Sequence, residues 1–392
     1  MAAAYIAGAV RTAGGRNKGR LAAIHPADLG GRVLDALVER TGIDPGAVDD
    51  VIFGCVSQSG AQSANIARNC VLSSKLPESV PATSVDRQCG SGQQAIHFAA
   101  QAVMSETQDL VIAGGVESMT RVPIGSSVLD ALQQGHGQPY DGEAIARRYP
   151  GVQFSQFTGA ELLAKKHGLS REALDVFSHQ SHARAARATR EGYFAREIVA
   201  LQVRSPEGEM LAHDSDEGIR FDASLDKMRT LQPLAPGGLI TAASSSQICD
   251  GAAALLIANE RALQRHGLSP RARLHTLTVV GDDPVIMLEG PIPATRKALA
   301  RAGMRLDDMD LYEVNEAFAP VPLAWAQVLG ADPDKLNVNG GAIALGHPLG
   351  ATGGKLMTTL LHELERRQGR FGLLAICEGG GTANCTIIER LA

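Results

Sequence analysis

The sequence predicts an α/β fold in which one mainly parallel unit occurs twice. The first copy combines a helical pattern over 29–40 with a buried strand over 48–54, and the second combines a helix over 294–302 with a strand over 306–314. Further along, each copy has a strand that enters a Gly-rich turn opening a helix, and then an apolar strand that ends in glycines. Alternating strands and helices at this spacing are typical of parallel α/β folds.

The later elements of the two copies follow one another in the same order, which argues against coincidence in a chain rich in strand–helix units. In the first copy they are a strand over 80–85, a turn over 89–92 and an apolar strand over 110–115, and in the second a strand over 337–339, a turn over 340–347 and an apolar strand over 373–381. The apolar run Ala2–Val10 predicts the first strand of the chain.

The segment 120–240 separates the two copies and has a different composition. It is richer in Gln, Arg, Glu and His, contains a Gly- and Gln-rich loop over 133–142 and predicts helices over 159–167 and 171–191. We expect an insertion that covers a ligand or forms a subunit contact, because loops on a rigid scaffold commonly carry binding residues. The predicted domains are a first core (1–119 plus 241–268), a loop domain (120–240) and a second core (269–392).

Composition and charge exclude several classes of function. The chain has 392 residues, 44% hydrophobic and 20% charged, with a net charge of −5, as expected for a globular protein of two or three domains. Neither a basic–aromatic stripe for nucleic acid nor an apolar stretch approaching the ~20 residues of a membrane span occurs. The six cysteines form no C-x-x-C pair and no secretory signal is evident, so we expect a cytoplasmic protein without a disulfide framework.

Cys89 stands where the strand of the first copy meets its Ala-rich helix. We expect it at the first turn of that helix, where unpaired N–H groups and the helix dipole favour an anion. This position lowers the pKa of a thiol and so favours the thiolate, which is the reactive form. A buried structural cysteine is the alternative, and the commoner case. The glycines at 90 and 92, which let a substrate carbonyl approach the backbone, favour the reactive interpretation.

Three residues of the second copy could serve the same site. His347 is surrounded by Gly and Pro, which makes it a poor core residue, although a structural histidine is the alternative. Cys377 ends an apolar strand before three glycines and could act as an acid or base near its ordinary pKa of ~8.5. Asn315 also follows a strand, where a turn or cap role is the alternative. The C-terminal ends of strands are where α/β proteins gather the groups of their sites.

Five short motifs resemble those of the thiolase family. They are Cys-Gly-Ser-Gly at 89–92, Gly-Gly-Val-Glu-Ser-Met at 114–119, Asn-Glu-Ala-Phe at 315–318, Gly-His-Pro at 346–348 and Cys-x-Gly-Gly-Gly at 377–381. The match spans the chain from Arg11-Thr12 to the last strand. The resemblance implies the duplicated, five-layered α/β/α/β/α thiolase fold, with an inserted loop domain that covers coenzyme A (CoA).

The resemblance also implies catalytic roles. Cys89 would be the nucleophile that carries the acyl group as a thioester. His347 would receive its proton, and Asn315 would fix a water that completes one oxyanion site. Cys377 would move the proton at the α-carbon. The backbone N–H groups of Cys89 and Gly379 would form a second oxyanion site, where losing one donor typically costs ~10²–10³ in rate.

CoA contacts and assembly are further implications of the resemblance. Ser246 matches the serine that contacts pantetheine and Arg220 the arginine at the nucleotide end, while a surface polar residue is the alternative for each. CoA and acyl-CoA are the implied partners, with CoA as a co-substrate, no tightly bound cofactor and no metal. A homodimer or homotetramer is implied, with the loop over 133–142 as a candidate for the second contact.

The implied reaction is reversible thiolytic cleavage of 3-ketoacyl-CoA to acyl-CoA and acetyl-CoA. Short-chain members of the family usually carry His-Met-Gly near the acyl pocket, but this chain has Phe154–Thr158, which favours longer or bulkier acyl chains and a degradative role in fatty acid β-oxidation. Biosynthetic acetoacetyl-CoA thiolase (acetyl-CoA C-acetyltransferase) is the alternative. A silent acyl-CoA or lipid carrier is a remote alternative, which the complete set of Cys89, Asn315, His347 and Cys377 disfavours.

Three other signals carry less weight. Glu378 stands where the family usually has an apolar residue, and we expect its side chain to point away from the site, as the next residue along a strand does. His179 and His182 are three apart on a helical run without an evident third ligand, so we expect a solvated helix face and not a metal site. The run 350–355 lacks the spacing of a phosphate loop.

Overall fold

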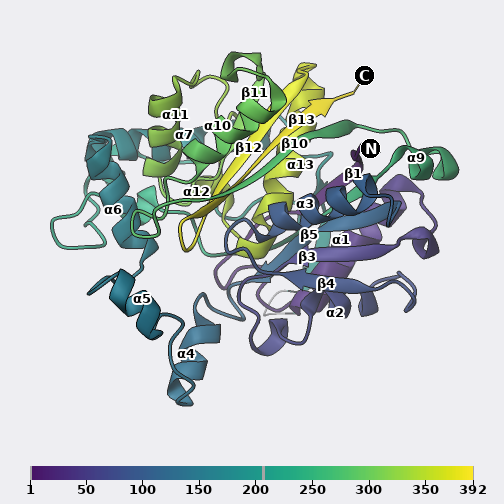
Figure 1. The fold of residues 1–392 in the computed structure, drawn as a ribbon, viewed down its shortest axis with the longest axis horizontal. Coiled ribbons are helices and arrows are strands. Elements are labelled where there is room, and N and C mark those ends of the chain that lie inside the picture. Colours follow the sequence, from purple (N-terminus) through teal and green to yellow (C-terminus); the bar gives the residue numbers. More distant parts are fainter. Residues whose placement is uncertain (1, 205–207, 392) are drawn as a thin grey trace.

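The computed structural model describes residues 2–204 and 208–391. In this part of the chain the central sheet has 11 strands, in the order β11-β12-β13-β10-β1-β9-β5-β3-β4, with β2 paired to β9 and β6 to β1. Figure 1 shows the first half of the chain, in purple and blue, beside the second half, in green and yellow. The halves join where β1 pairs with β10 through Tyr5–Arg273 and Ile6–Ala272.

The first half begins with strand β1 and ends with strand β9 and a short helix. Its elements are β1 (Tyr5–Thr12), β2 (Gly15–Arg16), α1 (Pro26–Thr41), β3 (Asp50–Gly54), α2 (Ile66–Leu72), β4 (Ala82–Val85), α3 (Ser91–Met104), β5 (Leu110–Ser118), β9 (Cys249–Ala258) and α9 (Glu260–His266). Helix α1 starts at Pro26, whose missing N–H would have no helical partner there, and ends at Thr41, where Gly42 caps it with φ of 69°.

The second half repeats the order of strand and helix found in the first. Its elements are β10 (Ala272–Gly281), α10 (Pro291–Ala302), β11 (Leu311–Val314), α11 (Pro320–Leu329), α12 (Ala342–Leu345), α13 (Thr352–Arg367), β12 (Phe371–Glu378) and β13 (Thr382–Arg390). The strand predicted over 337–339 is wrong, because these residues form a bend and a turn, and only the preceding Leu336 makes an isolated bridge, with Tyr312. The backbone of 337–339 instead continues into the Gly-rich turn before α12.

The sheet is mixed, so the prediction of a mainly parallel sheet is wrong. Strand β3 is parallel to β4 and β5, and β11 is parallel to β12. The pairs β5–β9, β9–β1, β1–β10, β10–β13 and β13–β12 are antiparallel. The last pair is a hairpin, whose turn contains Gly380 and Gly381 at φ of 79° and 75°, a conformation open to residues without Cβ.

Helices α3 and α13 lie between the strands of the first half of the chain and the strands of the second half. They contact each other and share a hydrophobic cluster with strands of both halves, which includes Ile96, Leu360 and Leu374. Gln93 on α3 also donates to the carbonyl of Leu374 on β12, at 3.1 Å. Helices α1 and α2 pack on the outer face of the first half, and α10 and α11 on that of the second. The predicted five layers are therefore confirmed.

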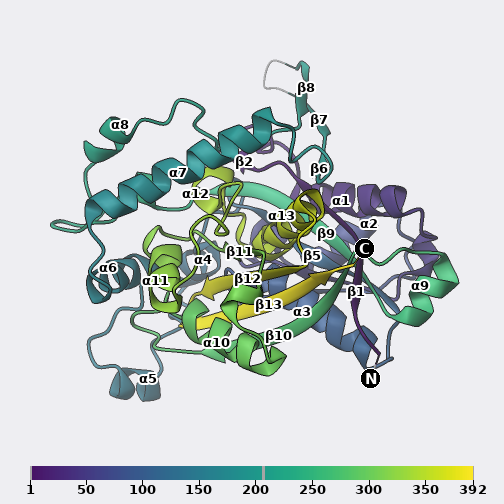
Figure 2. The same cartoon turned by 90° about the horizontal axis from the view of Figure 1, so that it is seen from above.

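The segment between β5 and β9 forms mainly helices. Its elements are α4 (Ser126–Gln133), α5 (Glu143–Arg148), α6 (Gln156–Lys166), α7 (Arg171–Arg190), β6 (Ile198–Val199), β7 (Leu201–Arg204), β8 (Met210–His213) and α8 (Leu225–Arg229). Helices α6 and α7 confirm the two helices predicted here, and α7 is the long helix at the upper side of Figure 2. Helices α4 and α5 bury no residue and extend away from the sheet in Figure 1.

Candidate functional site

Cys89 lies in the turn between β4 and α3. Ser91 closes this turn, because its Oγ donates to the carbonyl of Gln88 at 2.6 Å and accepts from the N–H of Arg87 at 2.8 Å. Gln88 itself has φ of 47°, in the left-handed region. Helix α3 begins at Ser91 with Gly90 as its N-cap. Cys89 thus precedes the helix. The prediction that it lies in the first turn of this helix is wrong.

The predicted shift of Cys89 toward thiolate is also wrong. Burial, together with the neighbouring carboxyl of Glu378, raises the pKa of the half-buried Cys89 to about 12. A helix dipole acts mainly within the first turn, and Cys89 is outside that turn. The thiol form is therefore the resting form of Cys89, and its proton needs an acceptor when the sulfur reacts.

His347 and Asn315, which both come from the second half of the chain, lie together. Nδ2 of Asn315 is 3.3 Å from Nε2 of His347, and both residues are buried. Asn315 follows β11, where its N–H donates to the carbonyl of Ala375 on β12 at 3.0 Å. Its Oδ1 is buried without a protein partner, so it can accept a hydrogen bond from a ligand. Burial, with the charge of Lys355, lowers the pKa of His347 to about 3, so the imidazole is neutral.

Thr352 determines which nitrogen of His347 carries the proton. The hydroxyl of Thr352 donates to the carbonyl of Pro348 at 3.0 Å, and its oxygen is 2.6 Å from Nδ1 of His347. Since the one hydroxyl proton is already used, this oxygen accepts from Nδ1–H. Nε2 then holds a lone pair beside Asn315. In this tautomer His347 can accept a proton at Nε2.

Glycines and Glu117 bring the turn of His347 against the start of α3. A Cβ at Gly92 would lie 2.6 Å from the carbonyl oxygen of Gly350, so only glycine permits this approach. The carboxyl of Glu117 accepts from the N–H groups of Gly350 and Val56, each at 2.9 Å, and of Ser57 at 3.0 Å. Glu117 is a positioning residue that sequence reasoning missed, although it stands in the quoted motif at 114–119.

Cys377 is the second-to-last residue of β12 and adjoins Cys89. Burial, the sulfur of Cys89 and the carboxyl of Glu378 raise the pKa of Cys377 well above its ordinary value. Gly379 follows at the turn, where a Cβ would lie 3.0 Å from Oε1 of Gln88. The structure therefore brings Cys89, Cys377 and Gly379 together at the end of β12, and it brings Asn315 and His347 together.

Comparison with known proteins agrees with this arrangement. The family model described as "Thiolase, N-terminal domain" matches residues 4–261, and "Thiolase, C-terminal domain" matches residues 268–390. The chain belongs to the thiolase family. This thiolase is therefore an enzyme of the acyltransferase class.

Relatives and a solved structure match this thiolase over its length. Steroid 3-ketoacyl-CoA thiolase FadA6 of Mycobacterium tuberculosis is 54% identical over 392 residues, which cover 100% of this chain and 95% of the relative. 3-Ketoacyl-CoA thiolase of Yersinia pestis is 43% identical over 390 residues, 98% of each chain. The crystal structure of acetyl-CoA acetyltransferase from Bacillus anthracis has a TM-score of 0.91 and 35% identity, covering 100% of this chain and 99% of that one.

A cavity of about 370 Å³ in the thiolase contains one of the two predicted CoA contacts. Arg220 lines it together with His182, Lys227 and Gln247, whereas Ser246 does not line it but immediately precedes Gln247. His182 is buried and its Nδ1 accepts from the N–H of Arg220 at 3.2 Å, so the predicted solvated helix face is wrong for this residue. Burial and Arg220 lower the pKa of His182 to about 4. Across residues 2–204 and 208–391, the structure has no cluster of three or more His, Cys, Asp or Glu arranged to hold a metal.

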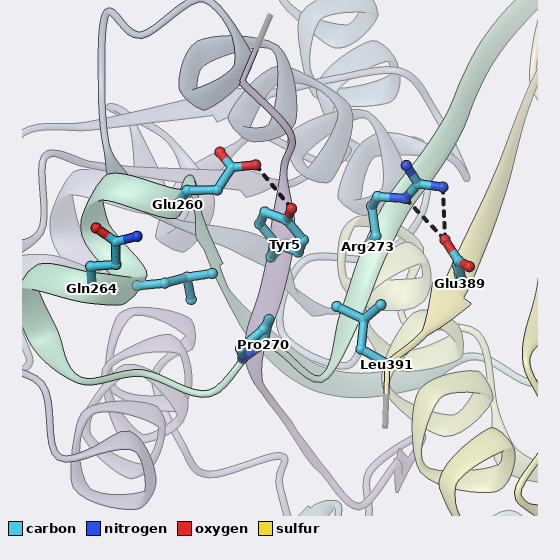
Figure 3. Close-up of a pocket in the computed structure, with 8 residues that line it drawn as sticks. Tyr5, Glu260, Gln264, Pro270, Arg273, Glu389 and Leu391 are labelled. Carbon is cyan, nitrogen blue, oxygen red and sulfur yellow. Dashed lines mark hydrogen bonds and ion pairs between the residues drawn. The ribbon is translucent and has the colours of Figure 1, made fainter.

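A larger cavity of about 510 Å³ is lined by residues in or next to strands β1, β10 and β13 and helix α9 (Figure 3). Tyr5 there donates to Glu260 at 2.9 Å, and Arg273 pairs with Glu389 at 2.7 Å. None of the predicted site residues lines this cavity.

In the part of the chain that the structure describes, no helix has the length and apolarity needed to span a membrane.

Replacing Thr352 with valine should test its control of the His347 tautomer. The variant keeps the shape of the side chain but loses the acceptor for Nδ1–H. We expect kcat/KM to fall by about 10–100-fold, as for the loss of one hydrogen bond to a group that becomes charged. Serine at position 352 should restore most of the rate. An unchanged rate in the valine variant would contradict this role.

Proposed function

We propose that this thiolase cleaves 3-ketoacyl-CoA with CoA to give acyl-CoA and acetyl-CoA, through an acyl group carried on Cys89. The observation that carries the proposal is the pair of neighbouring thiols, the half-buried Cys89 and the buried Cys377, in a structure that also brings the buried His347 and Asn315 together. A thiolase reaction needs one nucleophile and one separate proton carrier. The names of the Mycobacterium and Yersinia relatives describe the same reaction class.

In the first half-reaction, Cys89 attacks the ketone carbon of the substrate and its proton passes to Nε2 of His347. The bond between C2 and C3 then breaks, and its electron pair leaves as the enolate of acetyl-CoA. Cys377, whose raised pKa keeps it a thiol, gives its proton to C2 of the enolate. Acetyl-CoA leaves, and the acyl group remains on Cys89 as a thioester.

In the second half-reaction, the Cys377 thiolate takes the proton of incoming CoA, whose sulfur attacks the thioester. Acyl-CoA leaves, and Cys89 regains its proton from His347. We propose that the N–H groups of Cys89 and Gly379 stabilise one oxyanion, and that His347 with a water held by Asn315 stabilises the other. Run backward, the same steps are a Claisen condensation.

For CoA we propose the cavity that Arg220 lines, with Ser246 contacting the pantetheine. The cavity also contains Lys227 and adjoins the Asn-Glu-Ala-Phe segment through the N–H of Ser246, which donates to the carbonyl of Ala317 at 2.9 Å. Basic side chains suit the phosphates of CoA. We also propose the division into two cores and a CoA-covering domain over 120–240, and a cytoplasmic homodimer or homotetramer.

For the acyl group we propose a long or bulky chain. The Phe157 ring packs edge-on against Phe318, with centroids 5.5 Å apart, and Phe318 stands three residues after Asn315. Phe154 packs against Tyr140 and Tyr149, with centroids 4.8 and 5.3 Å apart. These rings give the start of α6 and the residues before it an apolar surface close to the site. The Mycobacterium relative, by its name, acts on a steroid 3-ketoacyl-CoA.

Thiolysis of 3-ketoacyl-CoAs of increasing chain length, including a polycyclic one, tests this proposal. We expect CoA-dependent cleavage whose kcat/KM rises from acetoacetyl-CoA to the longer and bulkier substrates. Absence of cleavage at every length would contradict the function. A rate confined to acetoacetyl-CoA would contradict the preference and favour the acetyl-CoA acetyltransferase activity that names the Bacillus structure.

A further inference from the structure

Glu378 lies inside the site, although the sequence led us to expect its side chain to point away. A Cβ at Gly90 would lie 2.6 Å from Cδ of Glu378 and would overlap Oε1. The segment from Gln88 to Gly90 passes the end of β12, where Gln88 lies beside Gly379, Cys89 near Cys377 and Gly90 beside Glu378. Alternation along a strand therefore fails to separate Glu378 from Cys377 here. The carboxyl occupies the space that the missing side chain of Gly90 leaves, directly after Cys89.

The carboxyl of Glu378 has one protein hydrogen bond. Thr382 on β13 donates its hydroxyl proton to Oε2 at 2.6 Å, while Oε1 is buried without a partner. A buried carboxylate with so few donors is costly, so the neutral acid is favoured. Because Oε2 already accepts a proton, the acid proton belongs on Oε1. Burial raises the pKa of Glu378 to about 8, against the opposing effects of Thr382 and Arg87.

Few charged groups face this carboxyl. The segment before α3 contributes Arg87 and Cys89, and β12 itself contributes Cys377, whereas the exposed Asp86 of the same segment acts on Cys89 and not on Glu378. Strand β13 contributes the uncharged Thr382. Negative charge on Glu378 raises the pKa of Cys89 and of Cys377. The two thiols and the carboxyl therefore form one cluster in which each negative charge disfavours the next.

We propose that Glu378 serves the reaction as a neutral acid that gates both cysteines: while it holds its proton either thiol can ionise, and once it has lost that proton both are held as thiols. Glu378 is then a positioning residue that acts on the two thiols through its charge, and the loss of its proton sets an upper pH limit for the site. The inference rests on the proposed role of Cys89 as the nucleophile.

The proton count of the cluster gives this gate a distinctive signature. The reactive state, a Cys89 thiolate beside a neutral Glu378, holds as many protons as the unreactive state, a thiol beside a carboxylate. Once the pH exceeds the pKa of Glu378, a further rise in pH therefore no longer increases the population of the reactive state. Below that point the amount of thiolate rises ten-fold for each pH unit, and above it the rise levels off.

Alkylation of Cys89 by iodoacetamide measures this signature without any CoA substrate. The rate at each pH is read on the Cys89 peptide by mass spectrometry, in the wild type and in Glu378→Gln, whose amide is neutral at every pH. We expect the logarithm of the wild-type rate to bend near pH 8, and that of Glu378→Gln to rise with unit slope. By pH 9.5 the variant should react roughly ten-fold faster, as expected for the removal of a unit charge a few ångströms away.

Two further variants separate the gate from a general loss of structure. In Thr382→Val the carboxylate loses its donor, so the bend should move to higher pH. In Asp86→Asn, which removes an exposed carboxylate of the same turn, the bend should stay in place. A wild-type profile of unit slope through pH 9.5, or a bend that persists in Glu378→Gln, overturns the proposal. Because the probe is not a substrate, failure of thiolysis would leave this measurement decisive.

Discussion

Replacing Cys89 with alanine is expected to lower the kcat of thiolysis by at least ~10⁴-fold, the loss typical of a removed nucleophile. The acyl group would have no sulfur to bind, and the carbon–carbon bond would have to break in a direct reaction with CoA. Consumption of 3-ketoacyl-CoA with CoA present gives the rate. Intact mass should also show an acyl adduct in the wild type incubated with 3-ketoacyl-CoA alone, and none in the variant.

Another buried cysteine supplies the control for this experiment. Cys385 is a free, fully buried thiol on β13, within 3.9 Å of the hydroxyl of Thr295 and outside the proposed site. Cys385→Ala should keep the rate within about three-fold, because it removes a sulfur without touching the proposed chemistry. If Cys89→Ala kept a rate within ten-fold of the wild type, or still formed the adduct, the covalent role would fail.

The sequence could predict which residues meet but not the electrostatics that they share. Predicted strand ends and the family motifs were enough to group Cys89, Asn315, His347 and Cys377, although in the structure His347 follows helix α12 and Cys377 lies within β12. The pKa of Cys89 depends on burial by distant segments and on Glu378, which no local pattern encodes. Thr352 was equally hidden, since its role comes from two hydrogen bonds within a buried turn.

Strand direction was the main failure at the level of the fold. Alternating strands and helices predicted a mainly parallel sheet, yet β9 and β13 run antiparallel to their neighbours. The direction of β9 depends on where the long segment 120–240 brings the chain back to the sheet. The three glycines after Glu378 were interpreted as a site feature, but they also form the turn of the hairpin with β13.

A buried ionic network links the first strand to the segment 120–240 and to α13. Arg11 donates to Glu197 at 2.6 Å and pairs through two nitrogens with Asp216 at 3.0 and 3.1 Å. Lys355 donates to the same Asp216 at 3.1 Å. The side chains of Arg11, Glu197 and Asp216 are at most 1% exposed, and that of Lys355 is 4% exposed. Two positive and two negative charges balance, although burial penalises each of them.

Replacing Arg11 with methionine should lower the free energy of unfolding by about 3–5 kcal/mol, because a broken buried pair leaves an uncompensated charge. Two carboxylates would then share one cation, Lys355. Urea unfolding followed by circular dichroism measures the loss. Arg305→Met is the matched control: Arg305 and its partner Asp307 are 78% and 76% exposed, and exposed pairs contribute about 0–1 kcal/mol.

The deficit of Arg11→Met should depend on pH. In the wild type, Arg11 and Lys355 hold the pKa of Asp216 below its ordinary value despite burial, so its contribution is complete above pH ~4 and is lost only as the pH falls further. Without Arg11 the pKa of Asp216 should rise above its unfolded value. Protons would then bind the folded variant more strongly, and its stability should fall as the pH rises from ~4 to 7. We therefore expect a larger deficit at pH 7.5 than at pH 4.5.

Removing one of the two carboxylates should reverse part of this loss. In Arg11→Met with Glu197→Gln, the remaining charges are Asp216 and Lys355, which still pair at 3.1 Å. The double variant should be more stable than Arg11→Met alone at pH 7.5, and its deficit should vary less with pH. Equal stability of the single and double variants would show that Arg11 acts through packing, for example on the Phe194 ring 5.0 Å from its guanidinium, and not through charge.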